Sequence, residues 1–300
     1  MAKSSQGIGF ECFSNAEEDV FLAMFSTGSD SEDEVCGRGK SVKEDVDVSF
    51  TPEPTAAIES IYQSVLGEED ISMNNIDRLV KVSLIERREL GIAHQLWPAA
   101  AYLCEYFHRN PQILFNNSTL SDELNKPKLS VLELGAGIGL CGMFVAQLLR
   151  KTHDTTVVLT DLPAAMDGLN ENIQFNALEG HVKTRVLSWG VKAELDAVLA
   201  ELNSCSSKGE APVVIAADCV YWECLYESLF HTFKDLIAAG CKVILSHMRR
   251  WKKDSKFFAM CRKAGWKVTM LHEAVRTVPA EHTGVPTRQV TRIYCIDKPL

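Results

Sequence analysis

Apolar and polar segments alternate regularly from about residue 129 to the end of the chain. Short runs rich in Val, Ile and Leu are followed by longer runs in which apolar residues recur at helical spacing. The predicted strands are 129–134, 156–160, 182–187, 212–217 and 242–246, and the predicted helices are 139–151, 163–175, 192–203, 223–238 and 252–264. Strict alternation of buried strands and helices predicts a parallel sheet with helices on both faces.

Two further strand-like runs, 266–271 and 290–296, end this pattern with no helix between them. Consecutive strands without a crossover helix normally pair antiparallel. We therefore predict an α/β fold with a Rossmann-like sheet of seven strands. The sheet is expected to be mostly parallel, with one antiparallel strand at its terminal end.

The segments before residue 129 are less regular. Residues 97–107 predict a helix with Pro98 in its first turn. The preceding segment, 79–97, is compatible with either a hairpin or a helix. A short amphipathic helix is expected at 56–65, and 116–128 has the polar composition of a loop.

Charge divides the chain further. Residues 1–57 contain twelve Asp or Glu and four Lys or Arg, a balance of −8, although the whole chain carries only −9. The acidity therefore belongs to this leader and says little about what the folded part binds. We predict three regions: an acidic, largely disordered leader (1–57), a lead-in of helices or a hairpin packed on the core (58–128), and the core itself (129–300).

The remaining composition indicates an ordinary globular protein, with 46% hydrophobic residues and no apolar run of membrane-spanning length. The first residues, MAKSSQGIGF, lack the apolar centre of a signal peptide. Ten cysteines occur without CxxC pairs or metal-ligand spacings, which is typical of reduced thiols. We expect a monomer in the cytoplasm, with the nucleus as the alternative, and no metal site.

The segment VLELGAGIGLCG, from Val131 to Gly142, carries the first chemical signal. A buried strand ends at a turn containing Gly135, Gly137 and Gly139, and a helix then begins. Such a turn brings main-chain N–H groups, and the positive end of the helix, close to a ligand.

A dinucleotide site is one interpretation of this turn. Its Gly-x-Gly-x-x-Gly fingerprint places a glycine where this chain has Leu140, so the third glycine comes one residue early. The carboxylate of Glu133 would also repel a phosphate, whereas it suits the ammonium group of a methionine moiety. The turn therefore favours S-adenosylmethionine over a nucleotide, and a purely structural glycine turn is the third interpretation.

Ligands of such sheets bind at the carboxyl ends of the strands, which directs attention to the residues there. Asp161 ends the second strand and can accept both ribose hydroxyls of an adenosyl group, or it can simply cap the next helix. Trp189 follows the third strand and can flank an adenine, or it can be core packing. His247, after the fifth strand, is better explained as a structural residue than as a base.

The fourth strand ends at Asp218, and Tyr221 follows in an Asp-x-x-Tyr spacing. A carboxylate and a phenol at this position can accept hydrogen bonds from an incoming amine, whereas the structural alternative is a helix cap and a core lid. Because no proline lies between them, the chain lacks the loop that stacks planar amides or nucleobases. An aliphatic amine is therefore the favoured acceptor. The basic segment 248–256 is interpreted as a solvated helix face, or else as a surface for an acidic protein or a phosphate backbone.

Taken together, these motifs resemble the lysine methyltransferases among the seven-strand (class I) methyltransferases, known as methyltransferase family 16, and within it the methyltransferase-like 21 group. The resemblance covers roughly residues 79–297. It rests on GIAHQLWPAA (91–100), LELGAGIGLCG (132–142), LTDLP (159–163), LNENIQFN (169–176), LSWG (187–190) and ADCVYW (217–222). The leader and the loop at 203–210 have no counterpart in the resemblance, so it does not identify the substrate.

The resemblance implies an S-adenosylmethionine-dependent protein-lysine N-methyltransferase. The residues expected to bind the cofactor are Trp97, Glu133, Gly135, Ala136, Gly137, Gly139, Asp161, Trp189 and Ala217, and those expected to be catalytic are Asp218 and Tyr221. The implied partner is a protein such as a chaperone, an ATPase or a translation factor, with no membrane or nucleic acid. The alternatives are a small-molecule amine or nicotinamide N-methyltransferase, an RNA methyltransferase, and a non-catalytic protein that binds S-adenosylmethionine.

Overall fold

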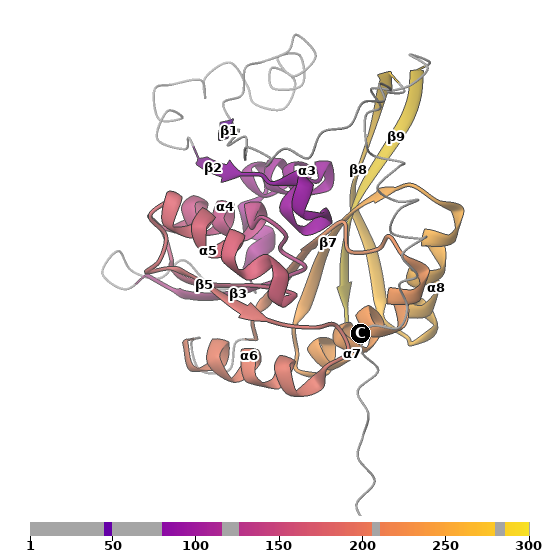
Figure 1. Ribbon diagram of the computed structural model, residues 1–300. Helices are drawn as coiled ribbons and strands as arrows, with labels where there is room; N and C mark the ends of the chain where they lie inside the picture. Colours follow the sequence, from indigo (N-terminus) through magenta and orange to yellow (C-terminus); the bar gives the residue numbers. More distant parts are fainter. Residues whose placement is uncertain (1–44, 50–79, 116–125, 206–210, 280–285, 300) are drawn as a thin grey trace, which may run out of the picture. The chain divides into compact units, whose positions relative to one another are not determined.

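A computed structural model describes residues 45–49, 80–115, 126–205, 211–279 and 286–299 (Figure 1). The chain divides into two compact units. One unit comprises Ser41–Arg276 with Gln289–Leu300 and contains nearly all described residues; the other comprises Met1–Lys40 with Thr277–Arg288. The three predicted regions and their boundaries remain predictions. Within the described ranges, no helix has both the length and the apolar character needed to cross a membrane.

A seven-stranded sheet forms the centre of the larger unit. Its strands are β3 (Lys128–Leu134), β4 (Asp154–Asp161), β5 (Val182–Val186), β6 (Val213–Ala217), β7 (Lys242–Arg249), β8 (Lys267–Pro279) and β9 (Pro286–Asp297). Their order across the sheet is β5-β4-β3-β6-β7-β9-β8. The first five pair in parallel, and β9 runs antiparallel to β7. This confirms the predicted seven-strand, mostly parallel fold with its antiparallel terminal element.

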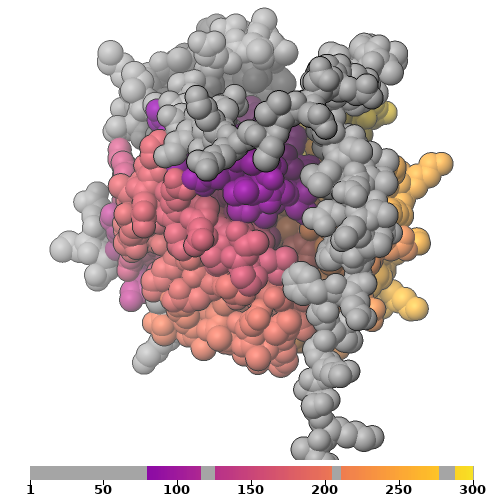
Figure 2. All heavy atoms as spheres, in the orientation of Figure 1, coloured from indigo at the N-terminus to yellow at the C-terminus, as the bar shows by residue number. Residues whose placement is uncertain are grey.

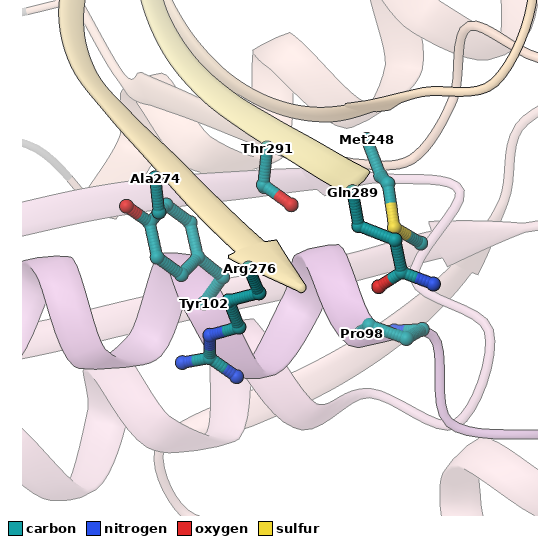
Figure 3. Close-up of a pocket in the computed structure, with 7 residues that line it drawn as sticks. All are labelled: Pro98, Tyr102, Met248, Ala274, Arg276, Gln289 and Thr291. Atoms are coloured by element: carbon teal, nitrogen blue, oxygen red, sulfur yellow. The ribbon is translucent and has the colours of Figure 1, made fainter. Parts of the chain in front are cut away.

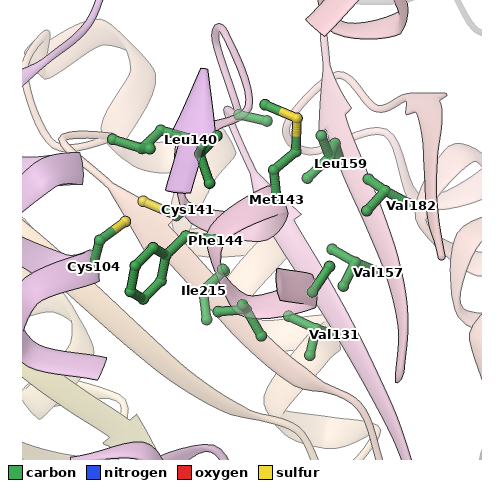
Figure 4. Packing of buried hydrophobic residues seen from close by; sticks show 14 of the residues in the cluster. Cys104, Val131, Leu140, Cys141, Met143, Phe144, Val157, Leu159, Val182 and Ile215 are labelled. Carbon is green, nitrogen blue, oxygen red and sulfur yellow. The ribbon is translucent and has the colours of Figure 1, made fainter. Parts of the chain in front are cut away.

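Helices cover both faces of the sheet, as predicted. One face carries α3 (Pro98–Arg109), α4 (Leu140–Leu149) and α5 (Met166–Phe175), and the other carries α6 (Lys192–Cys205), α7 (Tyr226–Ala238) and α8 (Ser255–Lys263). Neighbouring residues of one strand point into different cores, because side chains alternate along a strand. Val131 belongs to the α3–α5 core shown in Figure 4, whereas Leu132 belongs to the core on the other face.

Three helices begin later than the sequence pattern suggested, each after a short 3-10 turn. The turns η5 (Pro163–Ala165), η6 (Glu223–Leu225) and η7 (Lys252–Asp254) precede α5, α7 and α8. Further 3-10 turns, η2 (Arg88–Leu90), η3 (Ile92–His94) and η4 (Pro111–Leu114), flank α3. The tighter turns hold the chain at the carboxyl ends of the strands before each helix starts.

The segment left open at 79–97 forms a strand and two turns. The strand β2 (Lys81–Ile85) pairs antiparallel with β1 (Asp45–Ser49), a strand inside the leader that the sequence pattern did not predict. The remainder of the leader, the helix expected at 56–65 and most of the loop expected at 116–128 lie outside the described residues. Figure 2 shows the chain after β2 lying directly against the α5 region.

Two asparagines, one in α5 and one directly after it, hold β2 in place. The side-chain oxygen of Asn172 accepts the Ile85 N–H (2.8 Å), and that of Asn176 accepts the Ser83 N–H (2.9 Å). The Asn176 amide also donates to the Ser83 carbonyl (2.7 Å). These bonds replace the partners that another strand would supply to β2. They explain two of the three asparagines in LNENIQFN and position the segment that leads to Trp97.

Candidate active site at the carboxyl ends of the strands

The turn between β3 and α4 depends on its glycines. Gly135, Gly137 and Gly139 have φ angles of +58°, +55° and +86°, a left-handed conformation that L side chains rarely adopt. Space is also short, since a Cβ at Gly139 would lie 2.9 Å from side-chain carbons of Leu159 and Leu169. The Ala136 N–H donates to the Thr160 carbonyl (2.9 Å), which ties the turn to β4.

Glu133 supports this turn from below. Its carboxylate is 2% exposed and accepts the Gly142 N–H at 2.7 Å, so it faces α4 rather than the open end of the sheet. Burial raises the pKa of Glu133 to about 8, although the bond from Gly142 opposes the shift. The position differs from the expectation that this carboxylate meets a ligand ammonium group.

Asp161 lies at the end of β4, beside the glycine turn. Its carboxylate accepts the N–H groups of Gly137 (2.8 Å) and Leu162 (2.7 Å). Burial raises the pKa of Asp161, while these two bonds and the nearby His94 act in the opposite direction. His94 belongs to η3, which comes from the lead-in before α3.

Trp189 lies against the other side of the turn. A Cβ at Gly135 would lie 3.0 Å from the indole Cζ2 of Trp189 and 3.0 Å from the Cys219 sulfur. The Trp189 ring also meets the Tyr221 ring edge-on, with centroids 6.4 Å apart. Burial raises the pKa of Tyr221 well above its ordinary value, so its phenol stays protonated at neutral pH. These contacts bring the glycine turn and the Asp-x-x-Tyr segment together.

Asp218 adopts a left-handed φ of +59° directly after β6, and its residue is only 7% exposed. Its carboxylate is held by the Arg250 guanidinium through two parallel bonds, from Nη1 to Oδ1 (2.8 Å) and from Nη2 to Oδ2 (2.6 Å). The Met248 N–H adds a third bond to Oδ1 at 3.2 Å. Arg250 in turn lies 5.3 Å from the centroid of the Trp97 ring.

Trp97 is fixed by the lead-in. Its indole N–H donates to the Ile92 carbonyl at 2.9 Å, and the buried Glu86 carboxylate accepts the Leu96 N–H. The Arg87 N–H closes the same segment by donating to the His94 carbonyl at 2.8 Å. Hydrogen bonds therefore fix the loop before α3, and this loop places Trp97 beside Arg250, which binds Asp218.

All the residues expected from the sequence lie at this end of the sheet or, for Glu133, directly beneath it. The glycine turn carries Gly135, Ala136, Gly137 and Gly139, and the neighbouring strand ends and lead-in carry Asp161, Trp189, Ala217, Asp218, Tyr221 and Trp97. Main-chain N–H groups in a glycine turn, a carboxylate at the next strand end and a half-buried indole are suited to an adenosyl group joined to an amino acid. The residues present therefore fit S-adenosylmethionine.

Sequence reasoning missed Arg250 and His94. Arg250 was assigned to a solvated helix face, which is wrong: it lies after β7 and before η7, with a side chain only 15% exposed. Its place just beyond a strand end is the signal that could have identified it. His247 is 2% exposed, with its Nε2 3.5 Å from the Asp254 carboxylate, which agrees with the structural interpretation.

A small pocket lies beside the acceptor end of the site, between the start of α3, β7 and the two long terminal strands (Figure 3). It is lined by Pro98, Tyr102, Met248, Ala274, Arg276, Gln289 and Thr291. Pro98 follows Trp97 directly, and the Met248 N–H binds Asp218, so the pocket adjoins the residues just described. Among the described residues no cluster suited to a metal ion occurs.

Comparison with known proteins identifies the family. A family model described as "Lysine methyltransferase" matches residues 79–264. The chain belongs to the lysine methyltransferase family. Within this family it is 32% identical to the protein-lysine N-methyltransferase EFM6 of Saccharomyces cerevisiae over 203 residues, 64% of this chain and 78% of that protein. S-adenosylmethionine is accordingly its methyl donor.

Two other relatives show similar identity. Protein N-lysine methyltransferase METTL21A of Xenopus tropicalis is 29% identical, covering 58% of this chain and 69% of that protein. EEF1A lysine methyltransferase 3 of Mus musculus is 27% identical, covering 56% and 61% respectively. Among solved structures, the METTL16 methyltransferase domain superposes with a TM-score of 0.46 at 14% identity, covering 72% of this chain and 73% of that one.

Proposed function

We propose that this lysine methyltransferase modifies the side-chain amine of a lysine in a protein substrate, with Asp218 and Tyr221 receiving the amine. The observation that carries the proposal is the meeting of the glycine turn and Asp218 at one edge of the sheet. β3 and β6 are parallel neighbours, so the residues that follow them lie side by side. Trp189 lies against Gly135 and Tyr221, and so joins the two halves of the site.

The residues around the glycine turn form the half of the site that we propose binds the cofactor. We assign backbone contacts to Gly135, Ala136, Gly137 and Gly139, the ribose hydroxyls to Asp161, the adenine to Trp189, and the remaining pocket wall to Trp97 and Ala217. For Glu133 we propose a supporting role, because its buried carboxylate binds Gly142. The bond from Gly137 to Asp161 already holds that carboxylate beside the turn.

When bound, S-adenosylmethionine supplies an electrophilic methyl group on a positively charged sulfur. A neutral lysine amine forms the new N–C bond as the S–C bond breaks, and the sulfur takes the electron pair. The residues of this site therefore need chiefly to align the amine and exclude water. The Asp218 carboxylate and the Tyr221 oxygen would accept its N–H groups and direct its lone pair.

Protonation is the main barrier for this acceptor. With a pKa of about 10.4, a free lysine is neutral to roughly 0.04% near pH 7, a cost of about 4–5 kcal/mol. The half-buried surroundings of Tyr221 and Trp189, together with the sulfonium charge, lower that cost. An ionised Asp218 would favour the ammonium form, so we assign it orientation, and water takes the proton.

The substrate protein follows from the relatives only by class. Their names specify protein lysines and, in one case, EEF1A. A translation factor, a chaperone or an ATPase is therefore the class we propose for this chain. We further propose a monomer in the cytoplasm, which size-exclusion chromatography with light scattering and cell fractionation would test.

The test of this function uses tritiated S-adenosylmethionine and a cell extract, with Asp218→Ala as the variant. One or a few labelled protein bands, absent with the variant, are expected. Both proteins should bind S-adenosylhomocysteine equally in calorimetry, because Asp218 lies on the acceptor side. Label confined to small molecules or RNA would refute the protein-lysine assignment. Cofactor binding without any labelled product would indicate a non-catalytic binding protein.

A further inference from the structure

The pairing of Asp218 with Arg250 raises a question about charge at the acceptor site. An isolated carboxylate facing a lysine would stabilise the ammonium form, which cannot attack a methyl group. In this structure the carboxylate is not isolated, because both of its oxygens are bonded to one guanidinium at 2.8 and 2.6 Å. The pair is shielded from water, with the two side chains 4% and 15% exposed.

We propose that Arg250 is a positioning residue that clamps Asp218 and cancels its charge, so that the acceptor amine binds in its neutral form. The inference rests on the proposed function and deepens it. Arg250 would have two effects on the carboxylate. It fixes the direction in which the carboxylate accepts the amine hydrogen bond, and it balances the carboxylate's negative charge. A guanidinium fork supplies both at once, because it binds a carboxylate at two points and stays charged at any relevant pH.

Arg250 is itself held on three sides, which supports a dedicated role. Its guanidinium lies over the Trp97 ring at 5.3 Å, and its Nη1 also donates to the Met248 carbonyl at 3.3 Å. Its backbone N–H donates to the Asp254 carboxylate at 3.1 Å. Asp254 is 1% exposed and also accepts the Trp251 N–H (3.0 Å) and the Tyr226 hydroxyl (3.2 Å). The loop after β7 is therefore held by Asp254, and it presents the Arg250 side chain to Asp218 and Trp97.

The same contacts connect the two halves of the site. Trp97 is anchored to the lead-in through Ile92, and the carbonyl of Ala93 lies 3.4 Å from the position of a Cβ on Gly137. Arg250 thus touches the lead-in on one side and the acceptor carboxylate on the other. Several other titratable groups lie near Asp218. They are Tyr221, Cys219, the buried Glu133, and Asp161 with the nearby His94. None of them forms a described ion pair with Asp218.

The test compares variants that separate charge from geometry. Initial rates of label transfer to the band labelled by the wild type, in the same extract, are measured from pH 6.5 to 9.5 with saturating S-adenosylmethionine. The variants are Arg250→Gln, Arg250→Lys, Asp218→Asn and the double variant Asp218→Asn/Arg250→Gln. Arg249→Gln is the matched control, because that neighbouring arginine is exposed. Thermal unfolding and S-adenosylhomocysteine binding are recorded for every variant.

If Arg250 cancels the charge of Asp218, the pH dependence of the rate should shift in opposite directions in Arg250→Gln and Asp218→Asn. Arg250→Gln leaves an unbalanced carboxylate and should move the rise of the rate with pH upward by about one unit or more, which is about a tenfold loss near pH 7. Asp218→Asn leaves an unbalanced guanidinium and should move it downward, with a lower maximum. The double variant should return to the wild-type pH dependence. Arg250→Lys should keep the pH dependence but lose rate at every pH, because one ammonium cannot bind both oxygens.

Two results would overturn the inference. If Arg250→Gln lowers the rate equally at every pH, the arginine is only a structural support. If its pH dependence and rate equal those of Arg249→Gln, the clamp has no role. Failure of the proposed function is a different outcome, since the wild type itself would then label no protein.

Discussion

Replacing Glu133 by glutamine is expected to stabilise the protein, and to do so increasingly as the pH rises. In the folded state burial raises the pKa of Glu133 to about 8, whereas an exposed glutamate has a value of 4.5. Between these values the unfolded chain has released the proton and the folded chain retains it. Stability therefore falls as the pH rises through this window, and the loss is complete above about pH 8.

The size of the effect follows from the same difference. The difference between 4.5 and about 8 corresponds to a loss of about 5 kcal/mol in the free energy of unfolding once Glu133 is fully ionised. Only about 1 kcal/mol of this loss has already occurred at pH 5.5. Glutamine carries no charge and retains an oxygen for the Gly142 N–H, which Glu133 accepts at 2.7 Å. The advantage of the variant should thus grow by about 3–4 kcal/mol between pH 5.5 and 8.5. For a domain of this size that is on the order of 10 °C in Tm.

Thermal unfolding followed by circular dichroism at pH 5.5, 7.0 and 8.5 measures this growth. Glu201→Gln is the control, because Glu201 lies at the surface with Lys183 and Arg185 as partners. Hydrogen bonds and charges from these two residues outweigh the effect of burial and lower the pKa of Glu201. Its removal should cost a similar small amount at all three pH values. A Tm difference for Glu133→Gln that stays constant from pH 5.5 to 8.5 would refute the reasoning.

Three further changes test other parts of the structure. Gly142→Ala should lower the free energy of unfolding by about 1–3 kcal/mol in urea titrations, because a Cβ there would lie 2.2 Å from a methyl of Leu159; an unchanged midpoint would contradict the packing. Asp161→Asn should weaken S-adenosylmethionine binding about tenfold in calorimetry, since an amide has one accepting oxygen where the carboxylate has two. Arg276→Glu, in the pocket beside α3, should raise the KM for the protein substrate and leave kcat unchanged in steady-state assays; a loss confined to kcat would argue against a substrate contact there.

The sheet and its helices were predictable because both faces of the sheet are buried. The central strands β3, β4, β6 and β7 each contain a buried apolar run, and the helices that cover them have one apolar face, so the two periods separate clearly. The helix starts were less predictable. At 163–175, for example, Pro163 begins a 3-10 turn, and α5 starts only at Met166. Apolar spacing does not distinguish one tight turn from the first turn of an α-helix.

The lead-in was not predictable, because its partners are distant in the chain. The strand β2 forms hydrogen bonds with β1 on one edge, and on the other with Asn172 of α5 and Asn176 directly after this helix. Nothing in the sequence of β2 itself indicates either partner. The asparagines occur in a helical pattern, where their usual interpretation is an exposed polar face.

The pair of Asp218 and Arg250 shows why the composition of the site was easier to predict than its electrostatics. Asp218 could be located because it ends a strand, and strand ends meet at one edge. Its pairing with Arg250 requires the strand order, since only adjacency of β6 and β7 brings the two ends together. The Asp218 N–H donates to the Ser246 carbonyl (2.8 Å), which extends that pairing one residue beyond β6. Asp218 has a left-handed φ at this point, and its carboxylate binds both the Met248 N–H and the Arg250 guanidinium. The basic segment therefore contributes the Met248 N–H and the Arg250 side chain to Asp218, and the importance of Arg250 comes from its position rather than from the charge of its neighbours.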